Sequence, residues 1–315
     1  MKMSPGWIFF YLLVFPGFLF SSIVGLIYTW IDRKVTARVQ FRVGPPLLQP
    51  FYDFFKLLGK DTFVPDGAPR AIFLGAPLLG LASVSILSTI LLVSNILPHE
   101  TFLGDIIVVL YIFAFVPIVL IAGASASSNP ISALGASREM TLYLAYELPL
   151  LLSLATIIVK SGGMLRIGDL LMWQWTHHPF LYSLSGALAF VAAFLCIQAK
   201  LGFVPFDMAE AEQEIMGGTI IEYSGPALGV LKLVKAILYF VSSLFLVIMF
   251  WGGFRSPRDG WWYIFGWLKP VAVFVLIVLV KNTNPRLRID QALRFFWSIV
   301  LVIALAAFVL AAVGL

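Results

Sequence analysis

The sequence predicts an all-α polytopic membrane protein of about eight transmembrane helices, with one amphipathic helix in the membrane interface. Of its 315 residues, 61% are hydrophobic and 12% are charged, and the mean hydropathy is +0.98. A soluble domain carries about 25% charged residues. The apolar residues also lie in continuous runs, as in membrane helices, rather than alternating as in membrane strands. We therefore expect one integral membrane domain over residues 1–315 and no sizeable soluble domain.

The expected spans follow the apolar runs. The first extends from about Trp7 to Trp30, with a tryptophan anchor at each end, and Pro16 and Gly17 are expected to kink it. The other seven are expected near residues 71–96, 105–124, 140–160, 180–199, 226–251, 261–280 and 295–313.

Two polar stretches separate the early spans. Residues 31–70 hold the largest basic cluster, and part of that stretch has apolar side chains at helical spacing, namely Leu48, Phe51, Phe54, Phe55 and Leu58. This pattern over residues 47–58 is typical of an amphipathic helix lying in the membrane interface. Residues 123–139, GASASSNPISALGASRE, are rich in small residues and turn formers, so we expect a loop there.

Basic residues predict the orientation in the cell membrane. The loops after the first, third, fifth and seventh spans are expected near residues 31–70, 123–139, 200–226 and 281–294. They hold 13 of the 21 Lys and Arg residues, and the opposite loops hold six. The positive-inside rule puts these four loops in the cytoplasm and both termini outside. The net charge of +5 is accordingly attributed to lipid-facing loops rather than to a nucleic-acid surface.

An acidic stretch interrupts this apolar chain at residues 200–225, KLGFVPFDMAEAEQEIMGGTIIEYSG. It holds five of the 16 acidic residues, which are Asp207, Glu210, Glu212, Glu214 and Glu222. A helix starting at Pro205 would put Asp207, Glu210 and Glu214 on one face. Packing these carboxylates in a partly dry cavity would raise at least one pKa and give groups able to exchange protons. A solvated acidic loop, or a docking surface for a basic partner, explains the pattern equally well.

Glu147 is the sharpest single candidate, because it lies about two turns inside the fourth span. A charged group there costs about 2.5–3.5 kcal/mol on insertion scales, so such acids usually serve an ion path. We expect Lys235, in the sixth span, to be its counter-charge. A structural ion pair is the alternative. Glu139, beside Arg138, is either a further relay group or half of an interfacial ion pair.

Redox chemistry requires ligands that the sequence does not offer. Cys196 is the only cysteine, whereas an iron–sulfur cluster takes about four such ligands. The three histidines lack metal-ligand spacing. We therefore expect no metal site and no cofactor bound by this chain, and any electron transfer in another subunit. The lack of an internal repeat argues against an inverted-repeat transporter.

Several motifs together resemble one family. The stretches WIDRKVTARVQFRVGP, LLQPFYDFFKLLGKD, GASREM, PFDMAEAEQEI and EYSG resemble the membrane subunit that joins the two arms of respiratory complex I. Membrane-bound nickel–iron hydrogenases, including formate hydrogenlyases, share that subunit. The continuous GPPLLQP and the acid of GASRE, Glu139, are closer to the hydrogenase type than to the quinone type. Lys235 departs from the complex I pattern, which has a glutamate nearby.

The resemblance implies a non-catalytic membrane anchor and ion-coupling subunit of an energy-converting hydrogenase. Its peripheral large subunit and iron–sulfur small subunit would carry the nickel–iron site and the clusters. Antiporter-like and small membrane subunits would lie beside it in the bilayer. The resemblance also implies a docking role for Asp32, Arg33, Lys34, Arg38 and Arg42.

Under that resemblance, the acidic stretch, Glu139, Glu147 and Lys235 would link ferredoxin-dependent proton reduction to proton or sodium translocation. Three alternatives stay open. They are the same subunit in a sulfur- or quinone-reducing relative, a stand-alone cation–proton antiporter, and a purely structural anchor.

Overall fold

The computed structural model describes residues 10–101, 104–254 and 262–314. Within these ranges the regular elements are all helices, and seven of them are long and apolar enough to cross a membrane. An eighth apolar helix, α8 (Leu184–Lys200), has 17 residues, at the lower limit for a span. The predicted all-α fold is confirmed, with the fifth expected span shorter than the rest.

The elements follow the chain in a simple order. The long helices are α2 (Phe18–Val39), α4 (Arg70–Ile96), α5 (Asp105–Ser125), α6 (Pro130–Lys160), α10 (Gly225–Phe250) and α11 (Trp262–Thr283). The last span, Ile289–Val313, ends with α13 (Leu301–Val313). The short ones are α3 (Gln49–Leu58), α7 (Ile167–Thr176), α9 (Glu212–Ile215) and α12 (Ile289–Arg294). Single turns form η1 (Pro98–Glu100), η2 (Phe180–Tyr182) and η3 (Gly218–Ile220), and a π-helical segment, η4 (Phe295–Val300), joins α12 to α13.

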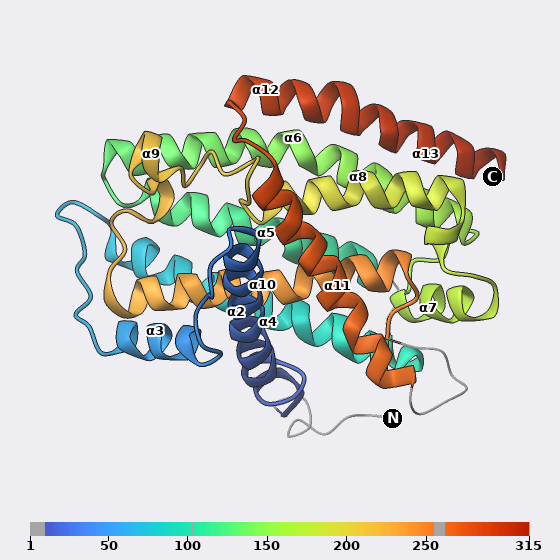
Figure 1. The fold of residues 1–315 in the computed structure, drawn as a ribbon, viewed down its shortest axis with the longest axis horizontal. Coiled ribbons are helices and arrows are strands. Elements are labelled where there is room, and N and C mark those ends of the chain that lie inside the picture. Colours follow the sequence, from blue (N-terminus) through green and yellow to red (C-terminus); the bar gives the residue numbers. More distant parts are fainter. Residues whose placement is uncertain (1–9, 102–103, 255–261, 315) are drawn as a thin grey trace.

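Helix α10 lies at the centre of the bundle. It packs against α4, α2 and α11, and nearly all of its side chains are buried. Figure 1 shows α4, α5, α6, α8 and α10 running along a common direction, with α2 and α11 crossing in front of them at a steep angle. A Cβ on Gly25 would lie 2.7 Å from the backbone of Ala236, so glycine is what lets α2 approach α10 this closely.

The first two predicted helical features are found. Residues 10–13 are helical, and a turn over residues 14–17 separates them from α2, as expected for Pro16 and Gly17. The expected start at Trp7 lies outside the described residues. Helix α3 matches the predicted amphipathic helix: Phe51 and Phe54 pack against the core, while Tyr52 and Phe55 are exposed.

The loop expected over residues 123–139 is wrong. Helix α5 continues to Ser125 and α6 already begins at Pro130, where the Asn129 side chain accepts a hydrogen bond from the Ile131 amide at 2.8 Å. The small residues serve packing instead of turns. A Cβ on Gly135 would lie 2.8 Å from the Thr219 amide nitrogen, so glycine allows η3 to rest on α6.

The bundle has two chemically different ends. The acidic end, as we call it, consists of α3, α9, η3 and the irregular segment 203–224, on the left of Figure 1. The opposite end consists of η1, α7 and η2, on the right. The sequence did not predict α7, which lies between the fourth and fifth expected spans. The expected loop at residues 281–294 is also shorter, because α12 begins at Ile289.

Candidate functional site

The acidic segment, residues 203–224, does not form the predicted helix from Pro205. Only Glu212–Ile215 are α-helical, as α9; η3 is a single 3-10 turn, and residues 203–211 are irregular. Tertiary bonds hold this part: Gln198 Nε2 donates to the Val204 carbonyl at 2.9 Å, and the Leu287 amide donates to the Pro205 carbonyl at 3.0 Å. A helix would have stacked like charges along one face, whereas the irregular path takes Asp207, Glu210 and Glu214 to separate partners.

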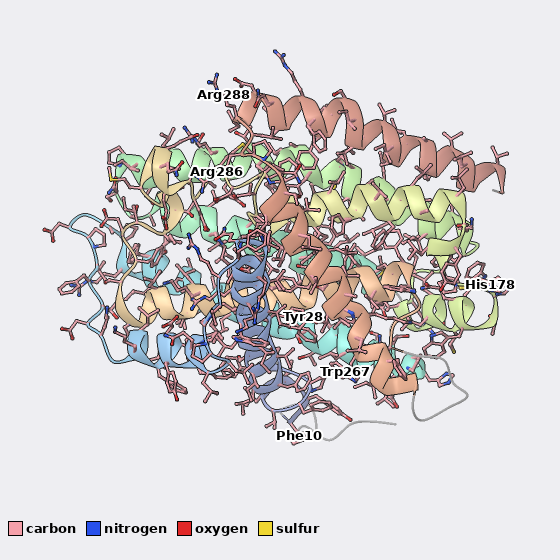
Figure 2. All side chains as sticks on the ribbon, viewed as in Figure 1. Phe10, Tyr28, His178, Trp267, Arg286 and Arg288 are labelled. Carbon is pink, nitrogen blue, oxygen red and sulfur yellow. The ribbon has the colours of Figure 1, made fainter. Side chains whose placement is uncertain are left out.

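Asp207 and Glu210 are each paired with a cation from a distant element. Asp207 Oδ2 accepts a hydrogen bond from Arg286 Nη2 at 2.9 Å, and Glu210 forms an ion pair with Lys235 of α10. Figure 2 shows Arg286 on the connection between α11 and α12. The expected pairing of Lys235 with Glu147 is therefore wrong, because the acidic segment folds back over α10 and brings Glu210 to the lysine.

Glu147 is paired with Lys200 instead. Lys200 Nζ lies 3.3 Å from Glu147 Oε2, and its side chain is only 1% exposed. The ammonium also lies 3.4 Å from the Phe113 carbonyl oxygen and 4.3 Å from the centroid of the Phe113 ring. Sequence reasoning placed Lys200 in a loop. The available signal was its position as the last residue of an apolar helix, immediately before the acidic segment.

A small cavity brings five of the charged side chains together. We call it the acidic cavity; its charged lining includes Glu139, Lys200, Asp207, Glu210 and Lys235. Its volume of about 50 Å³ is enough for roughly three to five water molecules, since each needs about 10–15 Å³. The rest of its lining is mostly apolar, so each charge acts in an environment of low polarity.

The protonation of Asp207 responds to this environment. Burial raises its pKa from the ordinary 3.8 to about 6, a shift that the Lys235 charge opposes and the Glu210 charge increases. Because Asp207 lies in the irregular segment, outside the membrane-spanning helices, it can exchange protons near neutral pH. A proton relay needs a group that is reached by protons and has a pKa near the working pH, and the Asp207 carboxylate meets both conditions.

Three of the predicted acids lie apart from the acidic cavity. Glu212 is exposed, Glu214 accepts a hydrogen bond from Arg138 at 2.6 Å, and Glu222 accepts one from the Asn129 amide. Of the two alternatives for Glu139, the local ion pair with Arg138 is not found, because Arg138 bonds Glu214 and Glu139 lines the cavity. The bonds of Glu214 and Glu222 hold the segment against α6 and its N-terminal cap, Asn129.

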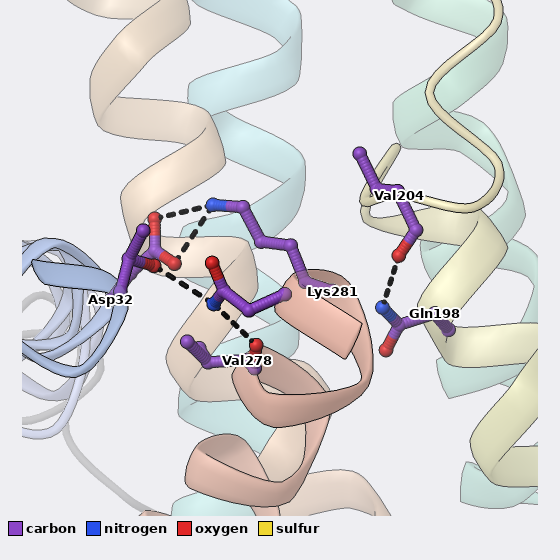
Figure 3. A network of polar contacts seen from close by, with 7 residues as sticks. Asp32, Gln198, Val204, Val278 and Lys281 are labelled. Atoms are coloured by element: carbon purple, nitrogen blue, oxygen red, sulfur yellow. Dashed lines mark hydrogen bonds and ion pairs between the residues drawn. The ribbon is translucent and has the colours of Figure 1, made fainter. Parts of the chain in front are cut away.

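The predicted docking residues also divide into two groups. Asp32 is buried and accepts two hydrogen bonds from Lys281 Nζ, at 2.8 and 2.9 Å, so it ties α2 to α11 rather than lying on a docking surface (Figure 3). Arg33 forms an ion pair with Asp53 at 2.6 Å, and Lys34 donates to the Val43 carbonyl at 2.9 Å. Arg38, in the last turn of α2, and Arg42, beyond its end at Val39, are both exposed.

The described part of the chain offers no cluster of metal-binding side chains. No group of three or more His, Cys, Asp and Glu side chains there is arranged to hold a metal ion. Cys196 is fully buried. The described residues do form a set of neighbouring charged groups that continues into the bundle: Lys200 lines the acidic cavity and also contacts Glu147.

Comparison with known proteins gives a consistent relationship. Residues 12–312 match the NADH dehydrogenase family. The chain is 36% identical to the H subunit of the NADH-quinone oxidoreductase of Thermomicrobium roseum, over 91% of each protein. It is 33% identical to the corresponding protein of Dehalococcoides mccartyi strain CBDB1, over 98% of this chain and 88% of the relative.

A solved structure extends the relationship to a sulfur-reducing system. A chain of the archaeal membrane-bound sulfane sulfur reductase superposes with a TM-score of 0.84 and 27% identity, over 97% of this chain and 99% of that one. None of these three relatives is described as a hydrogenase, so the expected hydrogenase type is not established by them. The match over nearly the whole sequence shows that the chain is a multi-pass member of the NADH dehydrogenase family, of the kind found in the membrane arm of complex I.

Proposed function

We propose that this chain is the membrane anchor and ion-coupling subunit of a complex I-like respiratory oxidoreductase. In that assembly, electron transfer in a peripheral partner drives proton or sodium translocation. One observation carries the proposal: Lys200 joins the acidic cavity to Glu147 inside the bundle, through an ion pair of 3.3 Å. The acidic end then faces the cytoplasm, as the basic loops indicate.

The coupling acts through shared charges. Asp207 takes up or releases a proton near pH 6, and it competes with Glu210 for the attraction of Lys235, which lines the same cavity. When the charge of one carboxylate changes, the neighbouring cations redistribute, because Coulomb attraction is strong where water is scarce. Lys200 passes that change to Glu147 over a single contact.

The test uses the whole complex reconstituted in sealed vesicles. Replacing Glu147→Gln removes the titratable group but keeps its shape, so ion transport should fall at least tenfold while electron transfer from the soluble donor continues. Glu212→Gln is the matched control, because Glu212 is exposed and does not line the acidic cavity. Transport that survives Glu147→Gln at the control level would instead support a purely structural anchor.

The electron acceptor is proposed separately. The GPPLLQP and GASRE motifs favour a nickel–iron hydrogenase partner that oxidises ferredoxin and reduces protons. The structural relative favours a sulfane sulfur-reducing partner, and the two NADH-quinone oxidoreductase relatives favour a quinone-reducing one. The purified complex is supplied with reduced ferredoxin and, in separate assays, with no added acceptor, a sulfane sulfur compound or a quinone; its product, hydrogen, sulfide or quinol, distinguishes the three. A lone chain that exchanges cations for protons without partners would contradict all three and favour the antiporter.

A further inference from the structure

A separate cavity lies at the opposite end of the bundle, where α6 and α7 end and α8 begins. We call it the α7 cavity; its volume is about 240 Å³. Pockets for whole small molecules usually have about 300–1,000 Å³. The α7 cavity therefore suits a compact polar group that belongs to a larger ligand lying outside it. Figure 2 shows His178, one of the lining residues, at this end of the molecule.

The lining of the α7 cavity is basic. Lys160, His177 and His178 line it, and no described Asp or Glu does. Lys160 Nζ donates to Ser185 Oγ at 2.8 Å, which places the ammonium at the first turn of α8. The positive end of the helix dipole lies at the same turn. The lysine and the helix N-terminus thus both favour an anion in this cavity.

The ring of His177 is held by two kinds of contact. Its Nδ1 lies 3.2 Å from the Trp173 carbonyl oxygen and 3.0 Å from Thr176 Oγ1. The ring also stacks on Trp173, at 4.5 Å between centroids, and Trp173 stacks on Phe180 at 4.8 Å. Because a carbonyl oxygen only accepts, Nδ1 is the donor and Nε2 is left for a ligand. A side chain fixed in this way loses little conformational freedom when a ligand binds.

The α7 cavity lies at the level of the membrane surface. Lys160 is the last residue of α6 and Ser183 caps α8, so two apolar helices end beside it. Val159 and Leu184, the next residue into each helix, are apolar and exposed. Tyr182 is exposed as well, and aromatic side chains are enriched at the boundary between headgroups and acyl chains. A ligand here meets basic groups inside the cavity and acyl chains directly beside it.

We propose that the α7 cavity binds the phosphate of an anionic phospholipid from the membrane leaflet at this end. The phosphate accepts hydrogen bonds from Lys160, His177 and His178, and the first acyl carbons lie against Tyr182 and Leu184. Basic pockets beside membrane helices recognise anionic headgroups in this way. The basic residues select for negative charge, and the adjoining apolar side chains select for a lipid over free phosphate. The site stands whether or not the acidic cavity couples ions.

The test uses phosphatidylglycerol with a photoactivatable group next to its phosphate, at subsaturating concentration, and the whole complex in phosphatidylcholine nanodiscs. Crosslinks should map to residues 160–184, and excess phosphatidylglycerol should compete them away. One basic residue near an anionic lipid contributes about a fivefold factor in affinity. K160Q should therefore lower the labelling about fivefold, and K160Q/H177Q/H178Q more than about tenfold. The conservative K160R should keep it, because arginine also binds phosphate.

The matched control is R166Q. Arg166 is exposed at the start of α7 and does not line the cavity, so labelling should stay unchanged. H177Q/H178Q keeps the test decisive if a Lys160 variant fails to assemble, because both histidines are exposed. Four results would overturn the proposal. They are an equal loss in R166Q, unchanged labelling in H177Q/H178Q, equal competition by phosphatidylcholine, and equal competition by inorganic phosphate.

Discussion

The two ends of the bundle use polar side chains in different ways. At the opposite end they bond to backbone: Gln174 Nε2 donates to the carbonyls of Ile248 and Met249, at 3.0 and 3.3 Å, and Trp175 Nε1 donates to Gly252 at 2.8 Å. At the acidic end they bond to one another, as in the ion pairs of Glu147, Asp207 and Glu210. A backbone carbonyl has no second protonation state, whereas a carboxylate does.

This difference separates stability from function. The side chains of the opposite end satisfy the free carbonyls at the end of α10, which is a fixed structural need. The pairs of the acidic end can be rearranged, because several carboxylates and cations line one cavity and compete. Variants at the two ends should therefore lower stability in both cases but change ion coupling only at the acidic end.

The largest effect is expected at Lys200. Lys200→Met removes the partner of Glu147 and leaves a largely buried carboxylate unpaired, so the free energy of unfolding should fall by about 3–5 kcal/mol. The double variant Lys200→Met with Glu147→Gln should recover most of that loss, because the unpaired charge is then gone. Thermal unfolding of the complex in mild detergent measures both. If the double variant is no more stable than the single one, the unpaired Glu147 carboxylate is not the cause of the lost stability.

Asp207 should give the acidic end a pH dependence. Its folded pKa of about 6 lies above the ordinary 3.8, so the folded state binds the proton more tightly than the unfolded state. The stabilisation is complete below about pH 3.8 and is lost as the pH rises through about 6. Asp207→Asn should remove up to about 1.4 kcal/mol per pH unit of slope within that window. Unfolding temperatures between pH 4 and pH 8 test this, and an unchanged slope would contradict it.

Gln174 tests the opposite end. Gln174→Leu leaves the carbonyls of Ile248 and Met249 without this donor, and a lost buried hydrogen bond costs about 1–3 kcal/mol. The number of ions moved per electron should stay at the wild-type value. Transport in reconstituted vesicles, normalised to electron transfer, measures that ratio. If this variant moves fewer ions per electron than the wild type, ion coupling also depends on the opposite end, and the distinction between the two ends fails.

The sequence predicted the helices well because each transmembrane helix corresponds to a continuous run of apolar residues. About 20 apolar residues in a row are needed to cross the bilayer, and α4, α5 and α10 begin and end within a residue or so of the runs that predicted them. The small residues around Gly135 were misread as a loop, because glycine marks a turn and a close helix contact equally well.

The candidate site was harder to predict than the fold. Glu139, Asp207, Glu210 and Lys235 do meet at one cavity, but Lys235 pairs with Glu210 and not with Glu147 as expected. Helical spacing tells which residues share a face, and it says nothing about a segment that folds back irregularly, as residues 203–211 do. The pairing of Glu147 with Lys200 depends on how α6 packs against α8, which is a tertiary fact.

The smallest effect is expected at Arg33, whose ion pair with α3 at the acidic end lies outside the acidic cavity. Arg33 and Asp53 are 2.6 Å apart, but about two fifths of each side chain is exposed (42% and 40%). Water screens such a pair, so Arg33→Gln should lower the free energy of unfolding by about 1 kcal/mol at most. Ion coupling should be unchanged, because Arg33 does not line the acidic cavity. In our proposal only residues that line this cavity or contact its lining belong to the relay, wherever else at this end a residue lies. Vesicle transport by Arg33→Gln checks this, and a loss of coupling there would extend the relay to α2 and α3.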